Sequence, residues 1–357
     1  MTALYFGVYN PAYSRNRVLI KGLKANGVEI IECRTSAKDG LKYLKLFWKF
    51  ILSPGFDLMI VGFPGQEVMF MARVLTRKKI IFDAFTSHYE GYILDRRYFD
   101  KNSLRAKYYR FVDKYSCRLA DLVLLDTQAH IDFFVKEYDL PVSKFRRIFV
   151  GTDTDVFYPA NLDANQSPST MLRASRQFTV HFHGSYVPLQ GISYIIKAAK
   201  LLENDNIKFN LIGRGQTYTH DRKLAESLQA GNINFMDDVA YNKLPKFMNQ
   251  ADIVLGIFGD SPKTQSVIPN KVYEALAMQK PIITADTSAI KELLTDRKNV
   301  ILCQVADAES LAAKILELKN NPNLRGRIAQ KGYEIFKLKA SEEKLGGELI
   351  KVLNYLI

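Results

Sequence analysis

The chain has 357 residues, 47% of them hydrophobic, and a formal net charge of +13. This length exceeds one ordinary core and indicates two α/β domains, while the apolar content excludes a mostly disordered protein. No apolar run reaches the roughly 18 to 20 residues of a spanning helix, and the start of the chain resembles a buried strand and loop, so we expect a cytoplasmic protein.

The positive charge indicates a partner such as nucleic acid, an anionic membrane or a phosphorylated substrate. Residues 1–160 hold 25 Lys and Arg against 17 Asp and Glu, and the remainder holds 25 against 20. No recognition motif supports nucleic acid. The three cysteines, Cys33, Cys117 and Cys303, lack CxxC spacing, which predicts neither a zinc site nor a disulfide framework.

Strand-like apolar runs alternate with helix-like segments in both halves, a pattern typical of parallel sheets covered by helices. In the first half the predicted strands are 3–8, 28–33, 58–62, 79–83, 122–126 and 145–150. In the second half they are 179–183, 208–212, 233–236, 253–256, 281–284 and 300–303. A polar, turn-rich segment at 158–177 separates the two sets and predicts a domain boundary.

The loop after the first predicted strand reads YNPAYSRNR and contains no GxGxxG motif, which argues against a nucleotide-dependent oxidoreductase. It offers Arg15 and Asn16 to a ligand cleft, although a solvated Arg15 fits the sequence equally well. Gly65 and Gln66 follow the third predicted strand. For them too the alternatives are a place in the ligand cleft or on the solvated surface.

Residues 41–52, LKYLKLFWKFIL, form an amphipathic segment. At about 100° per residue Lys42, Lys45 and Lys49 fall on one narrow stripe beside a wide apolar face that includes Trp48. Such a helix suits an anionic bilayer interface, and a second aromatic and basic run at residues 105–118 favours this interpretation. The alternative is a helix packed on the sheet with its lysines outward.

The stretch IIFDAFTSHYEGYILDR places Asp83, His88, Glu90 and Asp95 after the fourth predicted strand. This is the carboxyl edge at which open α/β sheets bind ligands. In the second half His181 and His183 alternate along a strand, but they lack a third ligand at suitable spacing, so we expect strand packing rather than a metal site.

The most informative stretch is 257–287, IFGDSPKTQSVIPNKVYEALAMQKPIITADT. It places small, polar and basic residues before a short helix, with Asn270 as a possible N-cap. The helix N-terminus offers unpaired N–H groups to a diphosphate, and Lys263 and Lys271 add full charges. Glu274, in the first turn, can accept two hydrogen bonds from a ribose diol. The plain alternative is an ordinary loop–helix–strand unit with solvated lysines.

Several blocks in order resemble the donor half of family 4 (group 1) glycosyltransferases over about residues 179–303: HFHGSYVPLQGISYIIKAAKLL, FNLIGRGQ, INFMDDVAYNKLPKFMNQADIVLGIF, IPNKVYEALAMQKPIITADT and KELLTDRKNVILC. More loosely, ADLVLLDTQAHIDFF and RRIFVGTDTDVFYP resemble the family's last N-terminal strand and its crossing into the donor domain. That crossing contains Asp153, Thr154 and Asp155, so we do not interpret them as a DxD metal motif.

The resemblance implies the GT-B fold, with two Rossmann-like α/β domains whose parallel sheets face a central cleft. It implies an acceptor domain at 1–157, a donor domain at 158–337 and a C-terminal helix, about 338–357, that crosses back. It also implies a retaining transfer from a nucleoside diphosphate sugar to an acceptor hydroxyl, with no metal or other cofactor required. His88 matches a family histidine that approaches the transferred sugar, and Asp83 and Glu90 lie beside it to orient an acceptor or act as base.

Two departures from the family stand out. The family pattern of two Glu residues separated by seven keeps Glu274 but has Ser266 at the first position. The family's Arg and Lys that hold the diphosphate correspond to Ser185 and Gln190, so we expect other basic residues to replace them. The predicted donor-binding residues are therefore Gly184, Ser185, Gln190, Gly191, Arg214, Lys263, Ser266, Asn270, Lys271 and Glu274.

We expect a glycan or lipid-linked acceptor in cell-envelope polysaccharide or glycolipid synthesis. We also expect a protein that is cytoplasmic or peripheral on the inner face of the cytoplasmic membrane. The alternative function is a catalytically weak or inactive sugar-nucleotide-binding scaffold, which Ser266 and the missing basic pair suggest.

Overall fold

The computed structural model describes residues 1–37, 40–160 and 177–356. Most of the predicted boundary segment at 158–177 lies outside the described residues. The chain forms two compact units: unit 1 comprises Met1–Asp153, Ser266–Ile268 and Lys339–Ile357, and unit 2 comprises Thr154–Gln265 and Pro269–Leu338. All twelve predicted strands are confirmed, with ends that differ by no more than a few residues.

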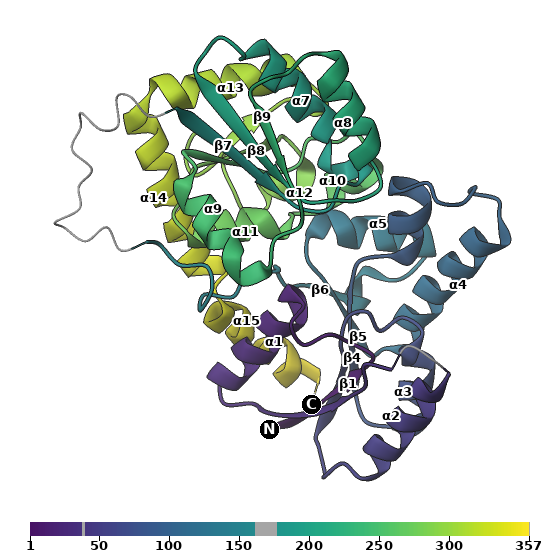
Figure 1. The fold of residues 1–357 in the computed structure, drawn as a ribbon. Coiled ribbons are helices and arrows are strands. Elements are labelled where there is room, and N and C mark those ends of the chain that lie inside the picture. Colours follow the sequence, from purple (N-terminus) through teal and green to yellow (C-terminus); the bar gives the residue numbers. More distant parts are fainter. Residues whose placement is uncertain (38–39, 161–176, 357) are drawn as a thin grey trace. The chain divides into compact units, whose positions relative to one another are not determined.

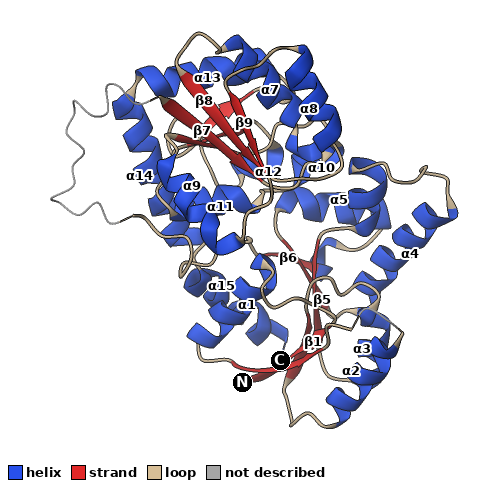
Figure 2. Cartoon of the chain, viewed as in Figure 1, coloured by secondary structure: helices blue, strands red, loops and turns tan. Residues whose placement is uncertain are grey.

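Unit 1 is built on a six-stranded parallel sheet with the order β2-β1-β3-β4-β5-β6 (Figures 1 and 2). Its strands are β1 (Thr2–Gly7), β2 (Glu29–Arg34), β3 (Leu58–Val61), β4 (Ile80–Phe85), β5 (Leu122–Leu125) and β6 (Phe145–Arg147). Apart from Asp83 in β4, the inner strands are buried and almost entirely apolar, as expected for a sheet with helices on both faces.

The helices of unit 1 divide between the two faces. Helices α1 (Ser14–Ala25) and α15 (Glu342–Leu356) pack against each other. The opposite face carries α2 (Leu41–Ile51), α3 (Val68–Leu75), α4 (Leu104–Leu119) and α5 (Gln128–Tyr138), whose inward side chains share one core with alternate strand residues. A π-helical turn, η1 (Glu90–Asp95), follows β4, and a short 3-10 turn, η2 (Val142–Lys144), precedes β6.

Unit 2 has a second six-stranded parallel sheet, in the order β12-β11-β10-β7-β8-β9. Its strands are β7 (Phe178–His183), β8 (Ile207–Ile212), β9 (Ile233–Met236), β10 (Ile253–Leu255), β11 (Ile282–Ala285) and β12 (Ile301–Cys303). Its helices are α7 (Ile192–Leu201), α8 (Tyr218–Ser227), α9 (Leu244–Gln250), α10 (Pro262–Ser266), α11 (Asn270–Ala277), α12 (Ser288–Lys291), α13 (Ala308–Asn320) and α14 (Pro322–Lys339), with 3-10 turns η3 (Pro188–Gln190) and η4 (Tyr241–Lys243).

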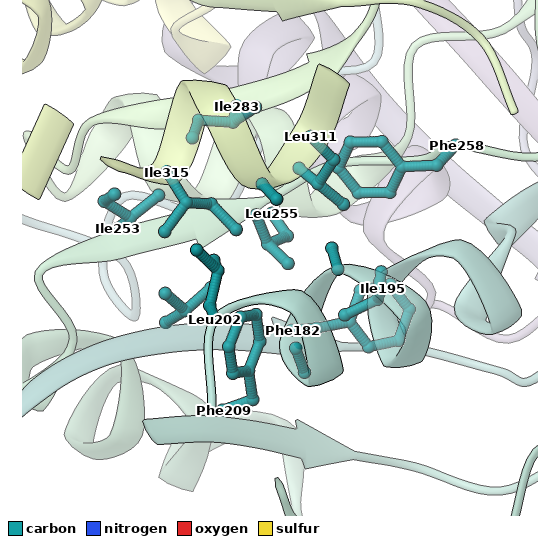
Figure 3. Packing of buried hydrophobic residues seen from close by; sticks show 14 of the residues in the cluster. Phe182, Ile195, Leu202, Phe209, Ile253, Leu255, Phe258, Ile283, Leu311 and Ile315 are labelled. Atoms are coloured by element: carbon teal, nitrogen blue, oxygen red, sulfur yellow. The ribbon is translucent and has the colours of Figure 1, made fainter. Parts of the chain in front are cut away.

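The core of unit 2 lies where α7 and α13 cover one face of the sheet (Figure 3). Phe182 and Phe209 from the strands meet Ile195 of α7 and Ile315 of α13 there. Because alternate residues of a strand point to opposite faces, the side chains of His181 and His183 point away from this core. Their face of β7 is therefore the one that carries the polar groups described next.

Candidate active site

The order of strands in unit 2 reverses at β7. Strands β8 and β9 follow on one side of it, and β10, β11 and β12 lie on the other. Open α/β sheets bind ligands at the carboxyl ends of the strands beside such a reversal. Here β7 ends at His183 and continues into Gly184, which has a φ of +144° that favours glycine. A Cβ atom on Gly184 would lie 3.0 Å from Lys271 Nζ, so the lysine closely approaches this strand end.

Glu274, on α11, is held by a chain of two imidazoles. His183 Nε2 lies 2.7 Å from Glu274 Oε2, and His181 Nε2 lies 3.0 Å from His183 Nδ1. A carboxylate accepts, so His183 donates through Nε2 and accepts from His181 at Nδ1. Burial lowers the pKa of His181 well below its usual range, which agrees with a neutral His181 ring. The chain fixes Oε2 and leaves Oε1 of Glu274 as the acceptor for a ligand.

Lys271 lies one turn earlier on the same helix and is 4% exposed. Its ammonium donates to Gln190 Oε1 and lies 3.6 Å from the centre of the Phe182 ring. Among the described residues no carboxylate lies within ion-pair distance of it. Burial lowers the pKa of Lys271 well below its usual range, although the nearby Glu274 opposes the shift. The site therefore holds a buried amino group that is paired with no carboxylate of the described residues, and burial disfavours its charged form.

The other predicted donor residues of unit 2 have mixed positions. Gly191, with a φ of +65°, starts α7 and leaves no room for a Cβ beside Gly259. Ser185 is exposed in the loop after β7. Arg214 follows β8, where it pairs with Asp237 at 2.5 Å. Lys263 lies half-buried on α10.

The predicted N-cap at Asn270 was wrong by one residue. Pro269, with extended backbone angles, occupies the N-cap position, and Asn270 is the first helical residue of α11. Proline fits here because its missing N–H would have no partner inside the helix. No side chain caps the helix, and of the first-turn N–H groups that of Val272 donates to the Pro269 carbonyl at 2.9 Å.

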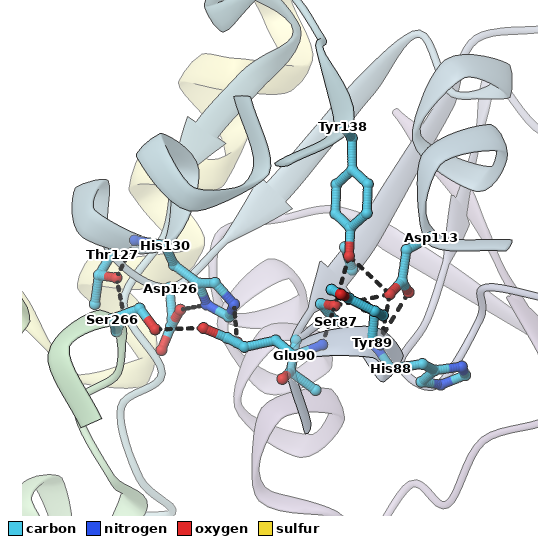
Figure 4. A network of polar contacts seen from close by, with 12 residues as sticks. Ser87, His88, Tyr89, Glu90, Asp113, Asp126, Thr127, His130, Tyr138 and Ser266 are labelled. Atoms are coloured by element: carbon cyan, nitrogen blue, oxygen red, sulfur yellow. Dashed lines mark hydrogen bonds and ion pairs between the residues drawn. The ribbon is translucent and has the colours of Figure 1, made fainter. Parts of the chain in front are cut away.

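Ser266, predicted as a donor-binding residue, groups with unit 1 (Figure 4). Its hydroxyl donates to Glu90 Oε1 at 2.7 Å, and its carbonyl accepts from the Thr127 hydroxyl. The position at which the family has an acid thus carries a serine that is bonded to the carboxylate of another residue. The sequence alone gives no sign of this contact, because it spans 176 positions.

Glu90 belongs to a buried polar network that also contains His130 and Asp126 (Figure 4). His130 Nε2 lies 3.0 Å from Glu90 Oε2, and its Nδ1 lies 2.8 Å from Asp126 Oδ1. Burial lowers the pKa of His130, but Glu90 and Asp126 outweigh this effect and raise it to about 9. The imidazole is therefore a cation between two carboxylates at neutral pH, and it fixes the position of Glu90.

His88 lies in a loop that Asp113 of α4 holds in place. The Asp113 carboxylate accepts from the backbone N–H groups of His88 and Tyr89, at 3.1 and 2.9 Å, and from the Ser87 hydroxyl at 2.7 Å. The His88 ring is half-buried between Tyr92 and Tyr109. No described residue makes a hydrogen bond to its Nδ1. Of the three predicted catalytic residues, His88 thus has the side chain with the fewest polar contacts to the described residues.

Asp83 and Arg15 form a fully buried ion pair, which corrects both sequence interpretations of Arg15. Arg15 donates to Asp83 from Nε and Nη2, at 3.0 and 2.8 Å, and its Nη1 donates to the carbonyls of Ile148 and Phe149. Neither side chain is solvated or open to a ligand. Burial raises the pKa of Asp83, although Arg15 opposes the shift, and the pair joins α1 to β4.

The remaining residues predicted on the acceptor side also serve local structure. Asn16 accepts from the Phe63 N–H at 3.1 Å and donates back to the Phe63 carbonyl at 2.6 Å. Gly65 has no room for a Cβ beside Val61. Gln66 is 1% exposed and donates to the Thr86 carbonyl at 2.8 Å. These contacts shape the loop after β3.

Several residues of these networks were not predicted as site residues, among them His183, His130 and Asp113. All three are buried polar residues, His183 on a central strand and the other two on helices. A polar residue in an apolar strand is a signal that the sequence offers for His183, but it does not identify Glu274, which lies 91 positions away.

Among the described residues, no cluster of three or more His, Cys, Asp or Glu side chains is placed to hold a metal ion. Asp153, from the DTD sequence, instead pairs with Arg17 and Lys21 of α1, at 2.8 and 2.7 Å. The three cysteines are buried and free.

Comparison with known proteins connects this geometry to a family. Residues 165–335 match the family described as Glycosyl transferases group 1. An uncharacterized glycosyltransferase of Methanocaldococcus jannaschii is 27% identical over 163 residues, which are 46% of this chain and 44% of the relative. The lipopolysaccharide core biosynthesis glycosyltransferase LpsE of Rhizobium meliloti is 23% identical over 174 residues, 48% of each chain. The matches span about half the length of these relatives.

Solved structures resemble the whole chain. Anabaena HepE in complex with UDP-glucose has a TM-score of 0.74 at 15% identity and covers 100% of both chains. Sucrose-phosphate synthase from Thermosynechococcus elongatus has a TM-score of 0.76 at 13% identity, covering 100% of this chain and 99% of that one. These likenesses show the GT-B fold, with its two Rossmann-like units. The match over residues 165–335 thus makes this part of the chain similar to the group 1 glycosyltransferases, and the solved structures show that the whole chain has the GT-B fold.

Proposed function

We propose that this protein transfers a sugar from a nucleoside diphosphate sugar to an acceptor hydroxyl, and that unit 2 holds the donor. The buried amino group of Lys271 carries this proposal, because no described carboxylate lies within ion-pair distance of it and a bound anion would stabilise its charged form. A buried charge is costly unless it is paired. A diphosphate at the carboxyl end of β7 would provide the missing negative charge and charge-assisted hydrogen bonds.

We propose that Lys271 takes the place of the basic residue that the family has at the position of Gln190. Its ammonium reaches the Gln190 side chain from α11, so it places a positive charge beside the position at which the family has a lysine. The uncapped N–H groups at the start of α11 lie on the same helix and favour the same anion. We propose that Glu274 receives the ribose through Oε1, while His183 holds Oε2.

We propose that Glu90 replaces the missing acid at position 266. The hydrogen bond from the Ser266 hydroxyl to Glu90 Oε1 supports this proposal, because it holds a carboxylate beside residue 266. His88 is our candidate for contact with the transferred sugar, because its Nδ1 is not engaged by the described residues. Asp83, which is tied to Arg15, is a positioning residue in this proposal.

For the reaction, we propose retention of anomeric configuration, which rests on the family resemblance. The leaving diphosphate helps to take the acceptor proton on the face from which it departs. Lys271 and backbone N–H groups stabilise the leaving group, so we propose no metal cofactor. For the acceptor we propose a glycan or lipid-linked molecule of the cell envelope, in keeping with the printed role of LpsE in lipopolysaccharide core biosynthesis.

A donor panel tests the proposal. We expect one of UDP-, GDP-, ADP- or TDP-linked sugars to raise the melting temperature and to release its nucleoside diphosphate slowly in water. UDP-glucose is the first to test, because HepE was solved with it. Glu274→Gln should weaken the dissociation constant of that donor about tenfold or more, whereas Glu309→Gln, on the exposed side of α13, should leave it unchanged.

Two outcomes would contradict the proposal in different ways. If no nucleotide sugar shifts the melting temperature, the donor site itself is wrong. If a donor binds tightly but neither hydrolysis nor transfer to any acceptor is found, the protein is a sugar-nucleotide-binding scaffold. Proton NMR of a transferred product would show whether the anomeric configuration is retained.

A further inference from the structure

Helix α2 of unit 1 turns its widest apolar face away from the protein. Only Leu46 on this helix is buried, whereas Leu44, Trp48 and Ile51 are 54, 56 and 54% exposed. At about 100° per residue these three side chains lie on the far side of the helix from Leu46. The helix does pack on the sheet, as the sequence alternative has it, but through Leu46 rather than through its wide apolar face. The inner face of α2 is narrow, and its apolar residues are mostly outside.

Helix α4 carries a second exposed apolar stripe. Leu104, Tyr108, Phe111 and Tyr115 recur at spacings of four, three and four residues, so they lie in one line along the helix. Their exposed fractions run from 37 to 83%. The inner face of α4 is filled separately by Ala106, Val112, Ser116 and Cys117. The residues of the exposed stripe are therefore different from those with which α4 packs against the core.

The two stripes form one surface, because α3 joins them. Tyr43 of α2, Phe70 of α3 and the α4 residues Tyr108 and Phe111 line a common hollow. The rings of Phe70 and Phe111 stack with centroids 6.3 Å apart. Figure 1 shows α2, α3 and α4 along the same side of the unit 1 sheet. We call the exposed apolar side chains of α2 and α4, with the C-cap Leu52, the aromatic surface. They number seven on α2 and its cap and four on α4, of the twenty large apolar side chains exposed in the described residues.

The charges around the aromatic surface are mostly positive. An exception is Glu67, which lines the same hollow and accepts a hydrogen bond from the Tyr108 hydroxyl at 3.4 Å. Helix α2 contains no Asp or Glu, and the one acid of α4, Asp113, is buried. Cations line both helices: Lys42, Lys45 and Lys49 on α2, and Arg105, Lys107, Arg110, Lys114 and Arg118 on α4. Arg110 pairs with Glu137 at 3.0 Å, which removes one cation from this set. The excess of basic residues in the first half of the chain is therefore concentrated around an exposed apolar face.

We propose that the aromatic surface docks on an anionic phospholipid bilayer. Apolar side chains would enter the acyl boundary, Trp48 and the tyrosines would lie at headgroup level, and the lysines and arginines would meet the phosphates. A second copy of the chain is disfavoured as the occupant, because a two-fold contact would oppose basic residues with basic residues. None of the described helices combines the length and apolarity needed to cross a bilayer, so the contact is peripheral.

Trp48 provides a direct probe of this contact, because it is the only tryptophan in the chain. Vesicles of phosphatidylcholine with about 30% phosphatidylglycerol should shift its emission to shorter wavelength, and the protein should float with them in a density gradient. Vesicles of phosphatidylcholine alone should do so at least about tenfold less strongly. Raising the salt concentration from about 0.1 to 0.5 M should weaken binding to the anionic vesicles.

Two variants separate the apolar and charged contributions. Leu44→Ser with Ile51→Ser removes exposed apolar side chains, and Lys42→Glu with Lys45→Glu reverses two charges; Lys49 is left in place because it donates to the Arg34 carbonyl at 2.9 Å. Each pair should reduce anionic vesicle binding about tenfold or more without lowering the melting temperature. Matched controls are Val142→Ser, 60% exposed away from the aromatic surface, and Lys136→Glu on α5. Both should bind vesicles like the unchanged protein.

The proposal is overturned if Trp48 emission and flotation are the same with and without anionic lipid. It is also overturned if Leu44→Ser with Ile51→Ser abolishes a concentration-dependent dimer while vesicle binding is unchanged, since the occupant would then be a second copy. Donor binding, measured by melting temperature without vesicles, should be the same in all these variants. Failure of the lipid proposal is therefore distinguishable from failure of the donor proposal.

Discussion

The Lys271 side chain is unfavourable for stability in the unliganded protein. Burial lowers its pKa well below the usual value of an unfolded chain, so the folded state disfavours the charged form. The sign follows by linkage: the unfolded state binds more protons, and stability rises as pH increases from the lowered pKa toward the ordinary lysine value. Such a residue is best explained by a ligand that restores the missing negative charge.

The substitution Lys271→Met tests this interpretation. Methionine retains an unbranched chain over the Phe182 ring but removes the charge. We expect the melting temperature without ligand to rise, corresponding to about 1 to 2 kcal/mol, and the donor dissociation constant to increase at least about tenfold. Thermal unfolding and calorimetric titration with the donor measure the two effects.

Lys291→Met, at a half-exposed lysine that pairs with Asp286, is the control and should change neither quantity by much. A loss of stability in Lys271→Met with unchanged donor affinity would identify Lys271 as a purely structural residue.

His130 has the opposite linkage. Its pKa in the folded protein is about 9, above the value near 6.5 of an unfolded chain. The folded state therefore binds the proton more tightly. The stability from this proton is fully present below about pH 6.5 and is lost as pH rises through about 9. This proton contributes up to about 3 kcal/mol to the free energy of unfolding.

The comparison of wild type with His130→Gln isolates this effect. The wild type should lose stability relative to the variant between pH 7 and pH 10, because glutamine cannot carry the proton. Urea unfolding at several pH values measures the difference, which cancels contributions from Lys271 and the cysteines. A difference that does not depend on pH would show that His130 is neutral in the folded protein.

Two helices of unit 1 meet through glycine. A Cβ on Gly346 of α15 would lie 2.0 Å from the Gly22 carbonyl oxygen of α1, and a Cβ on Gly22 would lie 2.3 Å from the Glu342 carbonyl oxygen. These obstacles are backbone atoms, which cannot rotate away. The close approach of α1 and α15 therefore depends on the absence of both side chains.

The neighbouring glycine of α15 gives a matched comparison. Gly346→Ala should destabilise unit 1 by about 2 kcal/mol or more, because the helices must separate. Gly347→Ala meets Asn26 only at an ordinary 3.4 Å, and it should stabilise the helix by about 0.5 to 1 kcal/mol. Denaturant unfolding of the two variants measures both values. Equal effects would mean that α1 and α15 are not packed as closely as described.

At the scale of the whole chain, alternating apolar runs and helical segments were sufficient to predict both parallel sheets. Strand periodicity is a local signal, and buried parallel strands are continuously apolar, so every strand was found. The resemblance to group 1 glycosyltransferases likewise rests on blocks that are contiguous in sequence. The fold and the family resemblance were therefore accessible without coordinates.

The polar networks were less accessible, because their partners are distant in sequence. Nothing local to Arg15 shows that Asp83 will bury it, and nothing near Ser266 identifies Glu90. Lys271 was predicted as a diphosphate ligand from its place at a helix start, but its burial and its bond to Gln190 required the packed structure. Amphipathicity alone also did not predict which face of α2 meets the sheet, because Leu46 is the one residue of this helix that is buried there.

Helix α4 carries both part of the aromatic surface and Asp113, which receives four hydrogen bonds from the His88 loop and Tyr138. The amide protons of His88 and Tyr89 are among these bonds, so they cannot exchange with solvent while the carboxylate stays in place. Their exchange lifetimes are consequently tied to the opening of α4 rather than to loop motion. A bilayer that slows the opening of this helix would lengthen the lifetime of the loop as well.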